Sequence, residues 1–396
     1  MKAGWKTVKL GEVCSFVSRG VSPRYVENEG ILVLNQKCVR NHRVSFDLAR
    51  RHDNLTKPFN EERLLRAGDV LVNSTGTGTL GRVAQLTEDP PEEATVDSHV
   101  SIVRPKKELF HLAYFGYAMI LIEPLIAEAG KGSVGQTELS REDLRNNFEI
   151  PLPPLAEQKR IVTLLDEAFA GIDEAKAKAD SNLTNARDLF QSSLRRTFYT
   201  EKWHAVELGT ICKTSSGGTP HKSHKEYYQD GQIPWLRSGE VNQRDIKTSE
   251  CFITEIGMQN SAAKLFPINT VLIAMYGATA GQVGILRFQS TTNQAVCGIL
   301  PCSFSPEFLY YFFLAIKDDL VAKAVGGAQP NISQEKIRGT LIPLVSGAEQ
   351  NKIVNELDAL AKCAQEIERL SREKSLLYGT LKSSLLTQAF AGELTA

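Results

Sequence analysis

Apolar residues along this chain follow two alternating patterns. Short apolar runs of about four residues lie between Gly-rich polar stretches, which is typical of β-strands. Longer polar–apolar stretches follow, in which apolar residues recur at steps of three and four, as in coiled-coil helices. Strands are predicted at residues 31–34, 69–72, 100–103, 233–236, 270–273 and 296–299, and short apolar helices at 109–126 and 306–325. The aromatic clusters at 114–117 and 310–313 are expected in the core, because they continue a helical apolar pattern.

Two long helices are predicted after the two strand-rich parts. From Leu155 to Thr200 the chain holds no proline and a single glycine, Gly171, so a helix on the order of 65 Å long fits. The expected apolar seams consist of Ile161, Leu165, Ala168, Ile172 and Leu189 in the first helix and of Ile353, Leu357, Leu360, Ile367 and Leu381 in the second. A lone helix would leave its seam in water. We therefore expect the two helices to pair, antiparallel, since each leads from one strand-rich part towards the other.

The chain is an internal repeat. Residues 5–14 recur 198 positions later as 203–212, and residues 150–162 recur 192 positions later as 342–354. The expected fold class is α+β, with two similar mixed α/β domains at 1–152 and 201–345 and two spacer helices at 153–200 and 346–396. Residues 389–394 also resemble residues 198–203, which run into the second module. This match predicts a pseudo-two-fold arrangement in which the N- and C-termini lie close together.

Composition narrows the class of protein. The 46 basic and 46 acidic residues cancel, which argues against a protein that coats nucleic acid indiscriminately. A local basic cluster at 37–57 is either a solvated loop or a binding face, and the sequence leaves both open. No apolar run approaches 18 residues and no signal peptide is visible, so no membrane partner and a cytoplasmic location are expected. The seven cysteines, without a Cys-x-x-Cys pair, predict reduced thiols and no metal site.

Two motifs resemble those of enzymes, and neither fits. Gly76, Gly78 and Gly81 match a dinucleotide-binding spacing after a strand, but residues 82–86 look like another strand and not the required helix. A hairpin-like Gly-rich loop is the better prediction. Residues 89–92, Asp-Pro-Pro-Glu, lack the aromatic residue of an amino-methyltransferase motif, and His99 aligns with Ala295 in the second module. We predict no catalytic residue and no cofactor in this chain.

Polar loops lie at matching points of both modules, and their side chains differ between the copies. Arg, Asn, Gln, Glu and Ser are the side chain types that read base edges through single or bidentate hydrogen bonds. The candidate DNA-contacting residues are Asn35, Gln36, Lys37, Arg40, Asn73, Ser74, Arg82, Lys131 and Gln136 in the first module and Arg237, Ser238, Glu240, Asn242, Tyr276, Gln282, Gln329 and Asn331 in the second. A repeated frame with divergent loops predicts a two-part, asymmetric DNA target. The alternative is that these are surface loops free to drift.

The order of these elements resembles the specificity subunit of type I restriction–modification systems. The resemblance rests on two modules that begin Trp-x-x-Val-x-Leu-Gly and end Ile-Pro-Leu, followed by Ala-Glu-Gln-x-x-Ile-Val and a long helix. It covers nearly the whole chain. Residues 329–333, Gln-Pro-Asn-Ile-Ser, also resemble a signature of that family, and the first module departs from it with Gln-Thr-Glu-Leu-Ser at 136–140.

The resemblance implies a non-catalytic, DNA-binding subunit of a complex. Each globular part would be a target recognition domain that reads one half of a bipartite site on double-stranded DNA, and the coiled coil would fix the spacer. Two methyltransferase subunits would dock near the helices and supply S-adenosylmethionine for methylation of a flipped adenine. Restriction subunits that use ATP and Mg can join the same complex. The main alternative is a duplicated coiled-coil adaptor that binds proteins and no nucleic acid.

Overall fold

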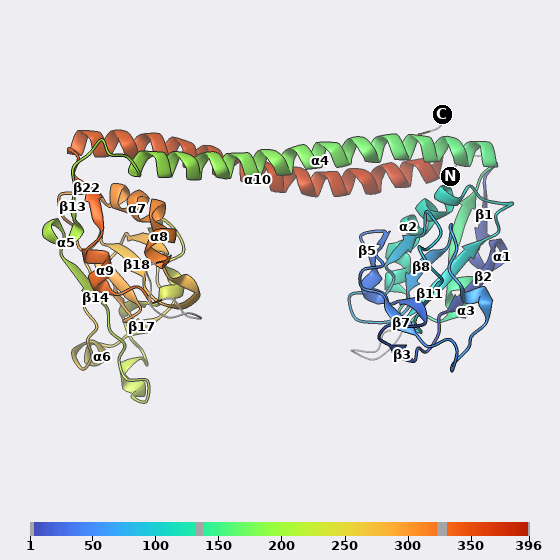
Figure 1. The fold of residues 1–396 in the computed structure, drawn as a ribbon, viewed down its shortest axis with the longest axis horizontal. Coiled ribbons are helices and arrows are strands. Elements are labelled where there is room, and N and C mark those ends of the chain that lie inside the picture. The colour runs from blue at the N-terminus through green and yellow to red at the C-terminus, as the bar shows by residue number, and fades with distance from the viewer. Residues whose placement is uncertain (1–3, 131–137, 323–330, 395–396) are drawn as a thin grey trace. The chain divides into compact units, whose positions relative to one another are not determined.

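The fold consists of two compact units, each of which holds one strand-rich part and segments of both long helices (Figure 1). A computed structural model describes residues 4–130, 138–322 and 331–394. The first unit comprises Met1–Lys178 and Glu373–Ala396, and the second unit comprises Ala179–Arg372. Each unit mixes sheets and helices. The predicted α+β class with two mixed domains and two long helices is therefore confirmed.

The first unit is built on two four-stranded sheets with the strand orders β2-β11-β8-β9 and β10-β4-β7-β3. The first of these sheets is antiparallel throughout, whereas β10 and β4 pair in parallel in the second. A β1–β12 pair and the short β5–β6 hairpin complete the unit. Its strands are β1 (Lys6–Lys9), β2 (Cys14–Arg19), β3 (Tyr25–Val26), β4 (Ile31–Leu34), β5 (Val39–Arg40), β6 (Arg43–Val44), β7 (Arg50–His52), β8 (Val70–Asn73), β9 (Val83–Gln85), β10 (Ala94–Val96), β11 (Val100–Pro105) and β12 (Glu149–Leu152). Its helices are α1 (Leu10–Val13), α2 (Leu112–Glu128) and α3 (Arg141–Asn146), with 3-10 turns η1 (Gln36–Cys38) and η2 (Glu61–Arg63).

The second unit repeats this frame with small changes. Its main sheet has the order β14-β21-β18-β19-β16, and its second sheet has the order β17-β15-β20. Its strands are β13 (Ala205–Glu207), β14 (Thr214–Ser216), β15 (Ile233–Leu236), β16 (Asp245–Ile246), β17 (Phe252–Ile253), β18 (Val271–Ala274), β19 (Val283–Leu286), β20 (Thr291–Thr292), β21 (Val296–Ile299) and β22 (Leu341–Pro343). Its helices are α5 (Leu208–Ile211), α6 (Glu255–Gln259), α7 (Pro306–Ala315), α8 (Lys317–Ala322) and α9 (Gln334–Arg338), with 3-10 turns η3 (Lys225–Tyr227), η4 (Ser238–Glu240) and η5 (Gly277–Thr279). The predicted helix over 306–325 is therefore divided between α7 and α8.

In each unit an aromatic helix packs between the main sheet and the long helices (Figure 1). Tyr114 and Phe115 on α2 are fully buried, and so are Tyr311 and Phe313 on α7. The cores of both units also contain apolar residues from the long helices α4 (Leu155–Phe198) and α10 (Gly347–Ala391). The prediction that the aromatic clusters belong to the core is confirmed.

A buried glutamine explains why Ala-Glu-Gln recurs. Gln158, on the first turn of α4, is fully buried and accepts a hydrogen bond from the backbone N–H of His111 at 2.8 Å. Its amide donates to the carbonyls of Leu109 and Pro153, both at 2.9 Å. The side chain thus satisfies backbone groups just before α2 and just before α4, which would otherwise be left unpaired. Gln350 on α10 makes the equivalent bonds to the N–H of Ser305 at 2.8 Å and the carbonyl of Val345 at 3.2 Å.

A second repeated contact ties the aromatic helix to the long helix. The Tyr117 hydroxyl donates to Asp166 on α4 at 2.5 Å, and the Tyr311 hydroxyl donates to Asp358 on α10 at 2.5 Å. Burial, reinforced by the neighbouring carboxylate, raises the pKa of both phenols, so each stays a proton donor. In the second unit Arg244 also bonds Asp358, at 2.5 Å.

Within each unit the segments of the two long helices lie side by side and run in opposite directions (Figure 1). In the first unit Lys382 bonds Asp173 at 2.6 Å, and in the second unit Arg187 bonds Glu368 at 2.7 Å. Trp5 and Leu394 pack against the same core of the first unit, which confirms that the two chain ends are neighbours. The antiparallel pairing is confirmed as well.

Eight of the ten predicted seam residues are buried or half-buried, and the prediction is wrong for the other two, which are exposed. Ile161, Leu165, Ile172, Ile353 and Leu357 are buried, and Ala168, Leu360 and Ile367 are half-buried. Leu189 is 59% exposed and Leu381 is 45% exposed. An α-helix has 3.6 residues per turn, whereas the predicted seam assumes 3.5, so the buried face shifts gradually along the sequence. It passes through Phe190 in α4 and through Lys382 in α10, each one position beyond the predicted residue.

The end of α10 repeats the end of α4, one residue away from the predicted alignment. Phe390 lies against Tyr114 with a ring centroid distance of 4.8 Å, and Phe198 lies against Phe308 at 5.5 Å. Phe390 is therefore the counterpart of Phe198, whereas the sequence match had paired it with Tyr199. The buried face of the helix, and not local sequence likeness, decides this alignment.

The prediction that all cysteines are reduced is wrong for one pair. Cys212 and Cys302 form a disulfide with their Cα atoms 5.4 Å apart, across a separation of 90 residues. The first unit offers no such pair to Cys14, the counterpart of Cys212. Cys14 is buried and free, and burial raises its pKa to about 12. Sequence spacing missed the pair because the sheet brings the segment after β21 back onto α5.

Candidate nucleic-acid interface

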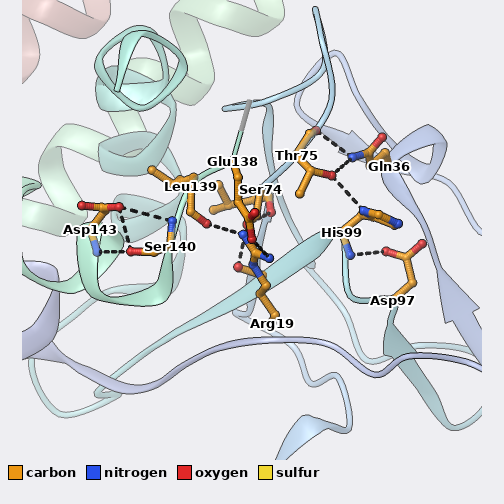
Figure 2. A network of polar contacts seen from close by, with 12 residues as sticks. Arg19, Gln36, Ser74, Thr75, Asp97, His99, Glu138, Leu139, Ser140 and Asp143 are labelled. Atoms are coloured by element: carbon orange, nitrogen blue, oxygen red, sulfur yellow. Dashed lines mark hydrogen bonds and ion pairs between the residues drawn. The ribbon is translucent and has the colours of Figure 1, made fainter. Parts of the chain in front are cut away.

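The first candidate loop in the first unit is the turn η1, which directly follows β4. Asn35 caps this turn, because its Oδ1 accepts from the N–H of Lys37 at 2.9 Å, and its Nδ2 donates to the carbonyl of Leu48 at 3.0 Å. The adjacent Gln36 reaches across to the Gly-rich loop, where its Nε2 donates to the carbonyl and hydroxyl oxygens of Thr75 at 2.7 and 2.6 Å (Figure 2). Asn35 therefore shapes the loop, and Gln36 joins it to its neighbour.

The Gly-rich loop after β8 is a tight hairpin, as predicted. Asn73 and Gly81 pair across it, with the Gly81 N–H bonded to the Asn73 carbonyl at 2.8 Å, and β9 follows directly. Gly81 has φ +89°, and a Cβ there would lie 2.6 Å from the backbone of Ala127, so glycine is required. The loop leads into a strand, which removes the geometry of a dinucleotide site.

Asn73 and Ser74 are fully buried in this hairpin and hold the frame. The Asn73 amide donates to the carbonyl of Gln36 at 3.2 Å, and the Ser74 hydroxyl lies 2.6 Å from that of Ser101. In this conformation neither side chain is accessible to a base. Arg82 is half-buried and donates to the carbonyl of Gly78 at 2.8 Å.

The third loop of the first unit meets the other two at its end. Lys131 and Gln136 lie outside the described residues. Glu138, which follows them, pairs with Arg19 and bridges to the backbone of Thr75, and Arg19 also donates to the carbonyl of Leu139 at 2.7 Å (Figure 2). The three loops predicted from the sequence are thus adjacent. Arg19 was missed, although its place directly before Gly20, at a strand end, could have indicated it.

Thr75 and the exposed His99 occupy the middle of this cluster. The Thr75 hydroxyl lies 2.9 Å from Nδ1 of His99, and the His99 N–H donates to Asp97 at 2.9 Å (Figure 2). Burial raises the pKa of the Asp97 carboxyl, and the backbone N–H of His99 opposes that rise. Neither Thr75 nor His99 was among the candidate residues, and the alignment of His99 with Ala295 had pointed away from a shared role.

Cations collect beside this cluster. Lys37 and Arg40 are exposed, and so is Arg43, which the candidate set left out. Within the described residues none of the three has an ion-pair partner. The alternative of a solvated loop is therefore less favoured for these three residues than for the rest of the cluster at 37–57, whose charges are partly neutralised.

In the second unit the first loop carries a different set of side chains on the same turn. η4 follows β15 as η1 follows β4, and a polar cavity of about 570 Å³ opens beside it. Arg237, Glu240 and Asn242 line this cavity, together with Gln243, Thr248 and Glu250, which sequence analysis missed. Arg237 donates to Glu250 at 3.0 Å, and its backbone N–H donates to Glu240 at 2.8 Å. Ser238 is half-buried within the turn.

The second and third loops of the second unit also meet. Tyr276, 39% exposed, forms a backbone bridge with the exposed Asn331, as Thr75 does with Glu138. Gln282 has a buried Oε1 without a hydrogen-bond partner among the described residues. Gln329 lies outside the described residues. Five predicted residues, Arg237, Glu240, Asn242, Tyr276 and Asn331, therefore have exposed or cavity-lining positions.

The methyltransferase-like motif at 89–92 has a structural role. Asp89 accepts from the N–H of Ala67 at 2.8 Å, and Glu92 forms a bidentate pair with Arg51 at 2.7 and 2.9 Å. Both carboxylates are therefore used to close surface loops. Among residues 4–130, 138–322 and 331–394, no group of three or more His, Cys, Asp or Glu is placed to hold a metal ion, and no helix is long and apolar enough to span a membrane.

Comparison with known proteins agrees with this duplicated architecture. A family model described as the type I restriction modification DNA specificity domain matches residues 2–181 and again residues 200–377. These two matches cover most of the chain, and the chain therefore belongs to the type I restriction–modification DNA specificity family.

Individual relatives extend the match along the chain. The specificity subunit of the Escherichia coli K12 type I enzyme EcoKI is 24% identical, over 99% of this chain and 90% of that protein. The E. coli EcoR124I/EcoR124II specificity subunit is 28% identical, over 58% of this chain and 59% of that protein. The HsdS subunit of Thermoanaerobacter tengcongensis has a similar fold, with a TM-score of 0.64 and 19% identity over 99% of this chain and 98% of that one. A chain from a structure of a type I R-M system gives a TM-score of 0.77 at 19% identity, over 99% of both chains.

Proposed function

We propose that this chain is the DNA-reading subunit of a type I restriction–modification complex. Each unit reads one half of a bipartite, asymmetric site on double-stranded DNA. One observation carries the proposal: the same three-loop frame is built twice, and matching positions carry different side chains, Gln36 against Ser238 and Lys37 against Gly239. Equal frames with unequal side chains suit two different half-sites on one duplex.

The physical basis of the reading is hydrogen bonding to base edges and contacts with phosphates. Arg237 in the polar cavity can donate two bonds to a guanine, and Asn242 can pair with an adenine. The long helices act as the spacer between the half-sites. Catalysis, with S-adenosylmethionine, ATP and Mg, belongs to partner subunits: two methyltransferase subunits and, for restriction, nuclease subunits. The chain itself is non-catalytic in this proposal.

Mapping of methylated adenines tests the proposal. The chain is expressed with its cognate methyltransferase in a host that lacks other adenine methylation, and modified positions are mapped across the genome. We expect one motif with two unlike halves separated by a spacer of fixed length. A contiguous or palindromic motif would contradict two unlike readers, and the absence of salt-sensitive DNA binding by the complex would favour the protein-interaction adaptor.

The spacer role has its own test. One heptad is inserted in α4 alone, between Lys176 and Asn182, where every residue except Ala179 is exposed. We expect the mapped spacer to change length or methylation to be lost, because one rod has been lengthened and the other has not. An unchanged spacer length would contradict the spacer role of the long helices, while the proposal that each unit reads one half-site would still stand.

A further inference from the structure

The short β5–β6 hairpin in the first unit has an unusual tip. Val39–Arg40 pairs with Arg43–Val44, and the two tip residues, Asn41 and His42, have φ values of 52° and 57°. Two successive left-handed residues are typical of a type I′ turn, which favours Asn-Gly. Histidine at the second position is a strained choice. The His42 ring is held by Glu123 on α2, with Nε2 and Oε2 3.3 Å apart.

The charges on this hairpin oppose each other. Arg40 and Arg43 are direct cross-strand partners, and like charges in such a pair destabilise a two-stranded ribbon. Both side chains are exposed, as is Lys37 one turn earlier, and in the described part of the chain no carboxylate pairs with any of them. We name these three residues, Lys37 on the turn η1 and Arg40 and Arg43 on the hairpin strands, the basic hairpin. An external anion beside the hairpin would offset the repulsion between the two arginines.

The neighbouring cations of the same segment are already engaged. Arg51 is paired with Glu92 at 2.7 Å, and Lys57 donates to the carbonyl of Ser22 at 2.7 Å. The Arg50 guanidinium lies 3.4 Å from the centre of the Tyr25 ring. Of the six cations between residues 37 and 57, only Lys37, Arg40 and Arg43 therefore lack a carboxylate, carbonyl or aromatic partner among the described residues.

The second unit lacks this feature at the matching place. There the chain after η4 forms β16, which pairs in parallel with β19 and makes no hairpin. Asn242 stands where the first unit has Arg40. The nearby Arg244 is tied to Asp358 at 2.5 Å, and Asp245 is paired with Arg287 at 2.5 Å. The local cation of the second unit thus holds the fold and is not offered to a ligand.

We propose that the basic hairpin, Lys37, Arg40 and Arg43, clamps the phosphate backbone of duplex DNA beside the bases that the first unit reads. This inference rests on the proposed function and adds a division of labour to it. Guanidinium groups bind phosphate oxygens through paired hydrogen bonds, and such contacts fix register without reading sequence. The first unit therefore supplies a sequence-independent grip that the second unit does not share at this position.

The salt dependence of DNA binding tests the clamp. The full chain in complex with its methyltransferase is titrated with a labelled duplex that carries the mapped motif, at several salt concentrations. The slope of log K against log salt is negative, and each lost phosphate contact reduces its magnitude by about 0.9. Arg40→Ala with Arg43→Ala should therefore reduce the magnitude by about 1.8. The methylated motif should stay the same. The matched control is Lys6→Ala with Lys107→Ala, which removes the same charge from exposed sites in the first unit and should leave the slope nearly unchanged.

A conservative pair separates phosphate contact from base reading. Arg40→Lys with Arg43→Lys keeps both charges, so slope and motif should be retained within a few-fold of wild-type affinity. Loss of base identity in one half-site by this variant would overturn the clamp in favour of direct base contact. An unchanged slope in the alanine variant, with thermal unfolding also unchanged, would overturn the clamp while the wild-type motif still supports the proposed function. Failure of the wild-type complex to bind the duplex at any salt would instead overturn the proposed function.

Discussion

The two units share a backbone frame and differ in the charge of their loops. In the first unit the turn after β4 and the hairpin that follows it bear three cations without an ion-pair partner among the described residues, whereas in the second unit the Arg237 guanidinium of the matching turn lies 3.7 Å from Glu240 and 3.0 Å from Glu250. The frame contacts tolerate substitution: Asp97 accepts from the N–H of His99 at 2.9 Å, and Asn293 accepts from that of Ala295 at 3.2 Å. The fold is therefore kept by contacts to the backbone, and the loops are free to acquire different recognition chemistry.

The largest expected difference between the units is their response to a reducing agent. The Cys212–Cys302 disulfide closes a loop of 90 residues, and Cys302→Ser or reduction should destabilise the second unit by about 2–4 kcal/mol. The first unit should not respond. Denaturant unfolding of the full chain checks this, with Trp5 as the probe of the first unit and Trp203 and Trp235 as probes of the second. Equal shifts at both probes would contradict the assignment.

Loss of the buried glutamine should be the next largest effect, and larger in the first unit. Gln158→Ala leaves three backbone groups without partners and should destabilise the first unit by roughly 3 kcal/mol. Gln350→Ala leaves two and should cost roughly 2 kcal/mol in the second. The same tryptophan probes report each loss. Gln365→Ala, at an exposed position on α10, is the control and should change neither.

Recognition should respond to Arg237 in one half-site alone. Arg237→Ala should weaken binding by about 1–3 kcal/mol at one base position if the guanidinium makes a bidentate base contact. Asn35→Ala, at the matching place in the first unit, should instead loosen its own turn. Competition binding with single-base variants of the mapped motif distinguishes the two. A uniform loss over all variants of the motif would make Arg237 a phosphate contact.

The smallest predicted difference concerns the tyrosine–aspartate contact. Tyr117→Phe removes the hydroxyl that donates to the exposed Asp166 carboxylate and should destabilise the first unit by about 1 kcal/mol. Tyr311→Phe should have an effect of about 0.5 kcal/mol, because Asp358 keeps Arg244 at 2.5 Å. Urea midpoints of the two variants measure this order. The reverse order would show that Arg244 does not support Asp358.

Periodicity predicted the elements well where a single rule decides them. The strands at 31–34, 233–236 and 296–299 have the predicted bounds: each is a short apolar run, and the first two end at a polar turn. The Gly-rich hairpin was predicted because a strand follows it. Repetition within the chain then gave the two-module architecture without any knowledge of tertiary contacts.

The misses share a cause, which is that distant contacts decided them. Leu189 and Leu381 fell off the seam because a drift of one residue accumulates over a long helix. The Cys212–Cys302 pair and the Glu250 carboxylate depend on segments that the sheets bring together. Asn73 and Ser74 have the composition of contact residues, yet the hairpin buries them. Polar identity alone does not tell a supporting side chain from an exposed one.

The buried Gln158 has a consequence for how such chains diversify. Its three bonds go to main-chain atoms of Leu109, His111 and Pro153, so the joint is indifferent to the side chains that surround it. Gln350 makes the same kind of joint. A recognition domain exchanged between two genes of this kind would find the same glutamine-to-backbone contacts, whatever bases it recognises. One exchange of a whole recognition domain can therefore create a new DNA target sequence.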